Sequence, residues 1–168
     1  MRKYEILMDE ENTIEFEGHT LHRIKALIDF SDIKKGDIGG YVEKEKNLSH
    51  EGNCWIYDDA KAMDNSAMYG NSRMYDNSEM HDNSTMYDYS AMCHNSRMHD
   101  YSIMYNNSTM YDYSEMYDYS EMYDNSTMYD YSAMYHNSRM HDNTKMYDYS
   151  AMYNNSIMFG NSEMHDND

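Results

Sequence analysis

Proline is absent from this chain of 168 residues, and glycine, cysteine, phenylalanine and tryptophan are scarce, with 7, 2, 3 and 1 residues. The two cysteines, Cys54 and Cys93, are too few for the disulfide framework of a small secreted domain. Leucine, isoleucine and valine are also few, and such a composition is typical of disordered chains. The abundant residues are methionine and tyrosine, with 20 of each.

Long hydrophobic runs are missing as well. The first 18 residues, MRKYEILMDEENTIEFEG, contain no apolar stretch as long as a secretion signal or a membrane span requires. We therefore expect a cytoplasmic protein that makes no contact with a membrane.

Positive charge is in short supply. The chain has 13 Lys and Arg against 31 Asp and Glu, a formal net charge of −18, of which residues 60–168 contribute −12. Such a surface repels nucleic acid and attracts cations and basic proteins. The charge argues against direct nucleic-acid binding and leaves two interpretations, recognition of a basic partner or solubility alone.

A six-residue repeat fills residues 60–167 as eighteen hexads without an insertion. Its consensus is Ser-x-Met-Tyr-Asp-Asn, and we number these positions 1 to 6. Position 3 is Met in all seventeen hexads from Met68 to Met164, and position 1 is Ser in each of them except at Thr144. A fixed period of this kind is the signature of a repeat architecture, which outweighs the composition.

The hexad fits a strand followed by a corner. Alternate residues of a strand share a face, so positions 1 and 3 point one way and positions 2 and 4 the other. The Asp-Asn pair at positions 5 and 6 tolerates the left-handed backbone of a tight corner. We expect the invariant Ser and Met to lie inside, with the stacked Ser hydroxyls hydrogen-bonded along the axis.

The charges at position 2 indicate how many faces a coil has. If three hexads form a coil, residues 18 apart stack, and all five charged pairs have opposite signs: Lys61/Glu79, Glu79/Arg97, Arg97/Glu115, Glu121/Arg139 and Lys145/Glu163. With two faces, the only charged pair would be Lys61/Arg73, which is like-signed. Opposite charges are favoured across neighbouring strands. We predict an all-β, three-sided parallel β-solenoid of about six coils.

Residues 1–47 lack the repeat and are predicted to form an N-terminal cap for the solenoid of residues 48–168. KYEILMD and TIEFEG are predicted to pair as a hairpin around Glu10–Asn12, and HTLHRIKALIDF to form a third strand or a short helix. Two further hexads, from Leu48 and Cys54, place His50 and Ile56 at the Met position.

The hexads resemble the hexapeptide-repeat, left-handed parallel β-helix superfamily, with Met in place of the usual Ile, Val or Leu. Residues 29–61, DFSDIKKGDIGGYVEKEKNLSHEGNCWIYDDAK, are similar to the entry segment of bacterial and phage members labelled as transferases. The likeness lies in residues 39–42 and 48–57. It implies a left-handed β-helix and leaves the activity open.

The best-known enzymes of that superfamily are acyltransferases, which usually use a His near a loop that leaves the coil. No loop interrupts the hexads here, so we predict no enzyme, no catalytic residue and no cofactor. His81 and His99 are 18 residues apart and should stack, which leaves two interpretations, a two-His metal site beside Asp82 or Asp100 and a simple replacement of exposed Tyr. The second is favoured, because nothing indicates a third ligand from another face. We predict no metal site there, and we assign no role to His94 or His136.

The outer positions 2 and 4 and the Asp row at position 5 are left for function. Stacked Tyr rings stabilise a sheet, and Tyr beside Asp and Asn is also typical of binding surfaces, so both roles stay open. The candidate binding surface comprises Tyr69, Tyr87, Tyr105, Tyr123, Tyr111, Tyr129, Tyr147, Asp112, Asp130, Asp148, Glu115 and Glu121.

Three functions compete. The favoured one is an acidic rod that occupies the basic surface of a nucleic-acid-binding protein, comparable with phage-encoded inhibitors of host defence such as anti-CRISPR proteins. The second is a structural module, because the unpaired strand edges of the last coil are expected to pair with a second copy as a homodimer. The third, a hexapeptide-type acyltransferase, rests on the resemblance alone.

Overall fold

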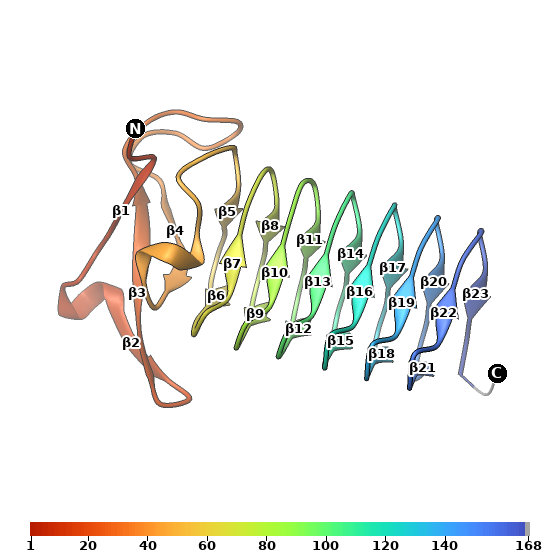
Figure 1. The fold of residues 1–168 in the computed structure, drawn as a ribbon. Coiled ribbons are helices and arrows are strands. Elements are labelled where there is room, and N and C mark those ends of the chain that lie inside the picture. The colour runs from red at the N-terminus through yellow and green to blue at the C-terminus, as the bar shows by residue number, and fades with distance from the viewer. Residues whose placement is uncertain (167–168) are drawn as a thin grey trace.

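The computed structural model of the chain describes residues 1–166 as a stack of three-sided coils that begins at a small group of longer strands (Figure 1). In these residues the helical segments are two short 3₁₀ turns, η1 (Glu10–Asn12) and η2 (Glu45–Asn47). No helix of the described part is long and apolar enough to cross a membrane. The prediction of an all-β solenoid is confirmed.

Each coil contributes one two-residue strand to each of three parallel sheets. The first face consists of β6 (Lys61–Ala62), β9 (Glu79–Met80), β12 (Arg97–Met98), β15 (Glu115–Met116), β18 (Ala133–Met134) and β21 (Ala151–Met152). The second face consists of β7 (Ala67–Met68), β10 (Thr85–Met86), β13 (Ile103–Met104), β16 (Glu121–Met122), β19 (Arg139–Met140) and β22 (Ile157–Met158). The third face consists of β5 (Trp55–Ile56), β8 (Arg73–Met74), β11 (Ala91–Met92), β14 (Thr109–Met110), β17 (Thr127–Met128), β20 (Lys145–Met146) and β23 (Glu163–Met164).

Residues 18 apart are partners in every one of these sheets, as the charges predict. The five oppositely charged pairs at position 2 all lie in register across neighbouring strands. Four of them form ion pairs, with N···O distances of 2.8 Å for Arg97–Glu79, 4.0 Å for Arg97–Glu115, 2.9 Å for Arg139–Glu121 and 3.5 Å for Lys145–Glu163. The faces hold six or seven coil strands, close to the predicted number of coils.

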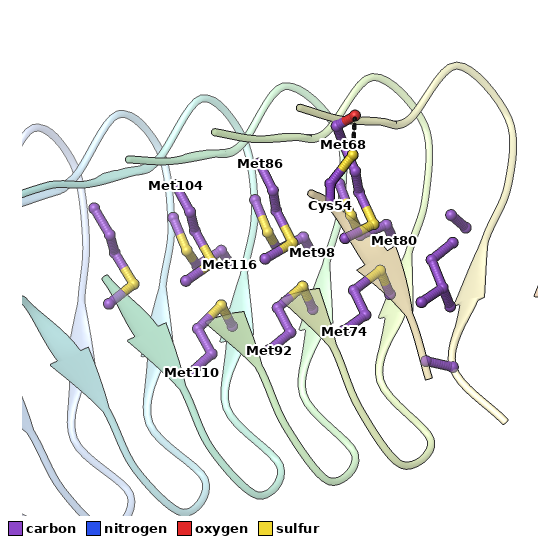
Figure 2. Packing of buried hydrophobic residues seen from close by; sticks show 14 of the residues in the cluster. Cys54, Met68, Met74, Met80, Met86, Met92, Met98, Met104, Met110 and Met116 are labelled. Atoms are coloured by element: carbon purple, nitrogen blue, oxygen red, sulfur yellow. Dashed lines mark hydrogen bonds between the residues drawn. The ribbon is translucent and has the colours of Figure 1, made fainter. Parts of the chain in front are cut away.

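The methionines fill the interior. Figure 2 shows their side chains directed from the strands into the space between the sheets, and every position-3 Met from Met68 to Met146 has no exposed surface. Complete burial of a Met side chain contributes roughly 1.5–3 kcal/mol. A flexible thioether adapts to irregular space, which lets one residue type serve all three faces. Met and Ser are therefore inside, as predicted.

The serine hydroxyls do not follow the prediction. Within residues 1–166, most of the buried position-1 hydroxyls, from Ser78 to Ser156, have no hydrogen-bond partner. Neighbouring coils lie about 4.8 Å apart, which is too far for one hydroxyl to reach the next. Ser72 and Ser84 instead donate to the carbonyl oxygen three residues earlier, at 2.9 and 2.7 Å.

The corners use the left-handed backbone that the Asp-Asn pairs predict. We call the turns after the three faces the first, second and third corners. The third corner keeps one geometry along the rod, with a positive φ at position 5 alone, for example 59° at Asp112 and 58° at Asp148. In later coils of the other two corners position 6 is also left-handed, as at Asn125 with φ 61°. The third corner is therefore the most regular edge of the solenoid.

The N-terminal strands differ from the predicted hairpin. β1 (Tyr4–Ile6) and β2 (Thr13–Phe16) do not pair with each other, and both pair antiparallel with β3 (His19–Ala26). They lie end to end along the same edge of β3, and the residues that connect them include η1. The other edge of β3 pairs with β4 (Ile38–Val42), and β4 then pairs in parallel with β6, which joins these strands to the first face.

The entry to the solenoid is packed closely and shifts the predicted register. A Cβ on Gly39 would lie 2.6 Å from the carbonyl oxygen of Ile56, so only glycine fits there. Ile56 pairs with Met74 as predicted. Leu48, however, is the partner of Met68, so Leu48 and not His50 takes the Met position, and the hexad register predicted for His50 is wrong. The His50 ring stacks on Tyr4 instead, at 4.3 Å.

Substitution of two serines tests the difference between a buried hydroxyl without a hydrogen-bond partner, as in Ser114, and one with a partner, as in Ser84. We expect Ser114→Ala to raise the free energy of unfolding by about 1 kcal/mol, because it removes a buried hydroxyl without a partner. Ser84→Ala should lower it by about 1 kcal/mol, because it removes the bond to His81. Chemical denaturation of both variants measures the difference, and equal destabilisation by the two changes would contradict this description of the core.

Candidate functional site

The third face carries a ladder of tyrosine rings at position 4. The ring centroids of Tyr111, Tyr129 and Tyr147 follow one another at 5.2 and 5.0 Å, with interplanar angles of 6° and 3°. Such spacing is the direct result of identical residues in register on neighbouring parallel strands. Offset parallel rings stabilise the stack and leave the outer ring edges on the surface.

A second ladder runs along the adjoining third corner, at position 6. Tyr113, Tyr131 and Tyr149 have ring centroids 4.9 Å apart in both steps. They are 50%, 49% and 66% exposed, so these rings are the more accessible of the two ladders. Our candidate surface omitted them, although their 18-residue spacing in the sequence already indicated a column.

A row of carboxylates lies between the two ladders. Asp112, Asp130 and Asp148 occupy position 5 of successive coils, directly between the position-4 and position-6 tyrosines of the same turn. Like charges at one strand spacing repel one another, so this row favours cations and basic groups. The third-corner surface, as we call it, consists of Tyr111, Tyr129, Tyr147, Asp112, Asp130, Asp148, Tyr113, Tyr131 and Tyr149.

Two corner histidines have partners that the sequence did not indicate. His94 Nδ1 lies 3.2 Å from Asp112 Oδ1, and His136 Nδ1 lies 3.0 Å from Asp118 Oδ2. Each histidine occupies a position at which most coils of its column have Asp, so it replaces a carboxylate repulsion by a contact with a neighbouring coil, the next one for His94 and the preceding one for His136. At the third corner His94 separates Asp112 from the acidic residues nearer the N-terminus.

The other predicted tyrosines form a separate column on the second face. Tyr69, Tyr87, Tyr105 and Tyr123 stack at 5.3, 5.0 and 4.9 Å, and His141 continues the stack at 4.7 Å. The second-face column and the third-corner surface are thus on different parts of the rod. The predicted set of residues divides into two surfaces.

Glu115 and Glu121 are held by partners within the chain. Glu115 Oε2 accepts a hydrogen bond from the Tyr117 hydroxyl at 2.7 Å, and Glu121 Oε2 accepts one from Tyr123 at the same distance. Their ion pairs with Arg97 and Arg139 further neutralise them. The structure places these two carboxylates on the first and second faces, away from the third corner.

His81 and His99 of the first face stack on each other in the same way as the tyrosines of the other columns. The rings of His81 and His99 are 4.6 Å apart and nearly parallel, and His81 Nε2 lies 3.4 Å from Glu79 Oε2. Burial, together with the neighbouring His81, lowers the pKa of His99. Among the described residues, the one group of three side chains with a metal-binding arrangement lies elsewhere, at His19, Glu43 and Asp64.

Comparison with known proteins gives one informative similarity. A protein of Escherichia coli (strain K12), described as the uncharacterized acetyltransferase YdcK, is 39% identical over 64 residues, which are 34% of this chain and 19% of that protein. The chain therefore spans about a fifth of the length of this relative. No family model matches the chain. The hexads, the parallel three-sided coil and this similarity fit the hexapeptide-repeat β-helix superfamily.

Two tyrosine–glutamate pairs predict a loss of stability in alkali. Burial, and then the hydrogen bond to Glu115, raises the pKa of Tyr117 above its ordinary value, and burial with Glu121 does the same for Tyr123. Their stabilising contribution is complete below about pH 10, where unfolded tyrosines begin to ionise, and it is lost as the pH rises through the folded-state pKa.

We therefore expect the denaturation midpoint to fall with pH above about 10. The fall should be shallower in the double variant Glu115→Gln/Glu121→Gln, because the carboxylates no longer oppose ionisation of the phenols. The comparison uses the slope of the denaturation midpoint against pH and not the midpoint itself, because the variant also loses two ion pairs, which lowers its midpoint at every pH. An unchanged or steeper slope in the variant would refute this origin of the pKa shifts.

Proposed function

We propose that this chain is a non-enzymatic binding protein whose third-corner surface occupies the basic, nucleic-acid-binding surface of a partner protein in the cytoplasm. The observation that carries the proposal is a row of corner carboxylates, Asp112, Asp130 and Asp148, set at one-coil spacing between two ladders of stacked tyrosines. An inhibitor of this kind, made by a phage against a host defence system, is the biological setting that we favour.

The charge of the rod supports a basic partner. The carboxylates of the third corner recur about every 4.8 Å along the rod, and each strand of B-DNA carries one phosphate per about 3.4 Å of helix axis, so both present a dense row of negative charge. Opposite potentials accelerate encounter and exclude acidic competitors. A partner that binds phosphates through Lys and Arg therefore meets a similar row of negative charge here.

The tyrosines support a contact that is more than electrostatic. Tyr and Arg are enriched at protein interfaces, and the outer edges and hydroxyls of the stacked rings stay available to pack against a guanidinium group and accept its hydrogen bonds. In the third corner each Asp has a Tyr on both sides in its own turn, so an arginine paired with Asp130 would also meet the rings of Tyr129 and Tyr131. The stacked rings are already ordered, which reduces the entropy lost on binding.

The proposal predicts which carboxylates matter. The immobilised chain is incubated with host lysate at low salt, and retained proteins are eluted with duplex DNA or with high salt. We expect nucleic-acid-binding proteins in the eluate, because DNA and salt both compete for the same basic surface.

The affinity for a purified retained partner is then measured with the double variant Asp130→Asn/Asp148→Asn. It should be weaker by about 2- to 30-fold, which is the effect expected from the loss of two exposed ion pairs.

A matched control is available on the second corner. Asp124→Asn/Asp142→Asn removes the same charge from the same position of the hexad, where asparagine rather than tyrosine follows. Asn already occupies this left-handed position at Asn106 and Asn154, so both double variants should fold. Equal weakening by the two pairs, binding that is indifferent to salt, or recovery of the chain alone as an oligomer would each contradict the proposal.

The second candidate is acyl transfer, which the name of the Escherichia coli relative favours. That name belongs to a protein of which this chain covers 19%. Isothermal titration with acetyl-CoA separates the two functions, because the binding proposal requires no acyl donor. Saturable binding that is lost on replacing a histidine such as His99 would favour the transferase.

A further inference from the structure

A mixed group of possible ligands lies where the N-terminal strands meet the first coil. His19 is the first residue of β3, Glu43 follows β4, and Asp64 is the position-5 residue of the first corner. One donor atom from each of the three lies within 4.8 Å of the other two. The side chains are 28%, 27% and 32% exposed, so the group is half-buried yet open to an ion from solvent.

Backbone contacts fix all three positions, that of His19 through the pairing of β3 with β2 opposite Phe16. The amide of Glu43 donates to the carbonyl oxygen of Ala62 at 3.1 Å, and the amide of Asp64 donates to Glu43 Oε2 at 2.6 Å. Asp64 has a φ of 55°, and its carbonyl oxygen accepts a hydrogen bond from the Asn47 side chain at 3.3 Å. Three segments far apart in the sequence are thus brought together, because β4 pairs with β3 on one side and with β6 of the first face on the other.

The distances suit an ion better than direct hydrogen bonds. The His19 ring lies between the two carboxylates, with Nδ1 3.7 Å from Glu43 Oε2 and Nε2 3.7 Å from Asp64 Oδ1. Both are longer than an N–H···O hydrogen bond. Donors bound to zinc at 2.0–2.2 Å lie roughly 3.4 Å from one another, so a small rotation of the side chains brings one nitrogen and two oxygens to that separation.

We propose that His19, Glu43 and Asp64 form a binding site for a divalent transition-metal ion such as Zn²⁺. One imidazole nitrogen and two carboxylate oxygens are an ordinary ligand set for this class of ion, with the remaining positions taken by water. The ion offsets the negative charge of two neighbouring carboxylates. One lysine already contributes, since Lys44 Nζ lies 3.4 Å from Glu43 Oε2. The ion also fastens β3 and β4 to the first corner.

Zinc chloride is the probe. Isothermal titration of the intact chain should show one site that His19→Ala or Glu43→Gln weakens at least tenfold, since loss of an outer partner alone costs about 10–100-fold. Glu43→Gln keeps an oxygen for the Asp64 amide, so it tests the ligand without removing that contact. Zinc at about a hundred times its Kd should raise the unfolding midpoint of the intact chain by roughly 5–10 °C and that of the variants less.

Two matched variants control for binding to other surface groups. Asp82→Asn removes the carboxylate that follows Asp64 one coil later in the same column, and His94→Ala removes an imidazole beside Asp112. Both should keep the zinc affinity of the intact chain. A Kd above about 1 mM in the intact chain, or an equal loss in a control variant and in His19→Ala, would overturn the site.

Discussion

The hydrogen bond from each coil to the coil that follows it is the interaction on which the whole molecule depends. The amide of Arg97 donates to Ser114 O at 3.0 Å and that of His99 to Met116 O at 2.9 Å, and the same step recurs along all three faces. It holds residues 18 apart in register, so each side chain lies on a residue of the same hexad position. Ladders of Tyr, rows of Asp and alternating charges are all consequences of this one register.

The core consists of Met and Ser because one hexad sequence is used on all three faces. Since every hexad must be able to occupy every face, the inward residues adapt by flexibility rather than by shape. Most Ser hydroxyls of residues 1–166 lack a partner in this arrangement, because the coil spacing prevents hydrogen bonds between stacked serines. The outer positions escape the constraint, and variation is concentrated there.

The sequence was sufficient to predict the structure of the repeated hexads, but it was insufficient to predict the contacts that occur only once in the chain. The number of faces followed from five charge pairs, and the buried Met and Ser followed from their invariance. The pairing of β1 and β2 with β3, and the place of Leu48 rather than His50 opposite Met68, depend on contacts without a period. The third corner was only half foreseen, since Tyr113, Tyr131 and Tyr149 join the predicted aspartates through the turn. The cluster of His19, Glu43 and Asp64 joins segments that no local pattern relates.

The register can be tested in solution with one native cysteine. Cys93 takes the place of a tyrosine in the third-face ladder, between Tyr75 and Tyr111. Neighbouring parallel strands bring residues within the Cα separation that a disulfide needs, about 4.4–6.8 Å. Mild oxidation should therefore link Cys93 to the new thiol in Tyr111→Cys, 18 residues away, and leave both thiols free in Tyr105→Cys, 12 residues away. Cross-linking in the second variant, or its absence in the first, would contradict the three-sided coil and every surface derived from it.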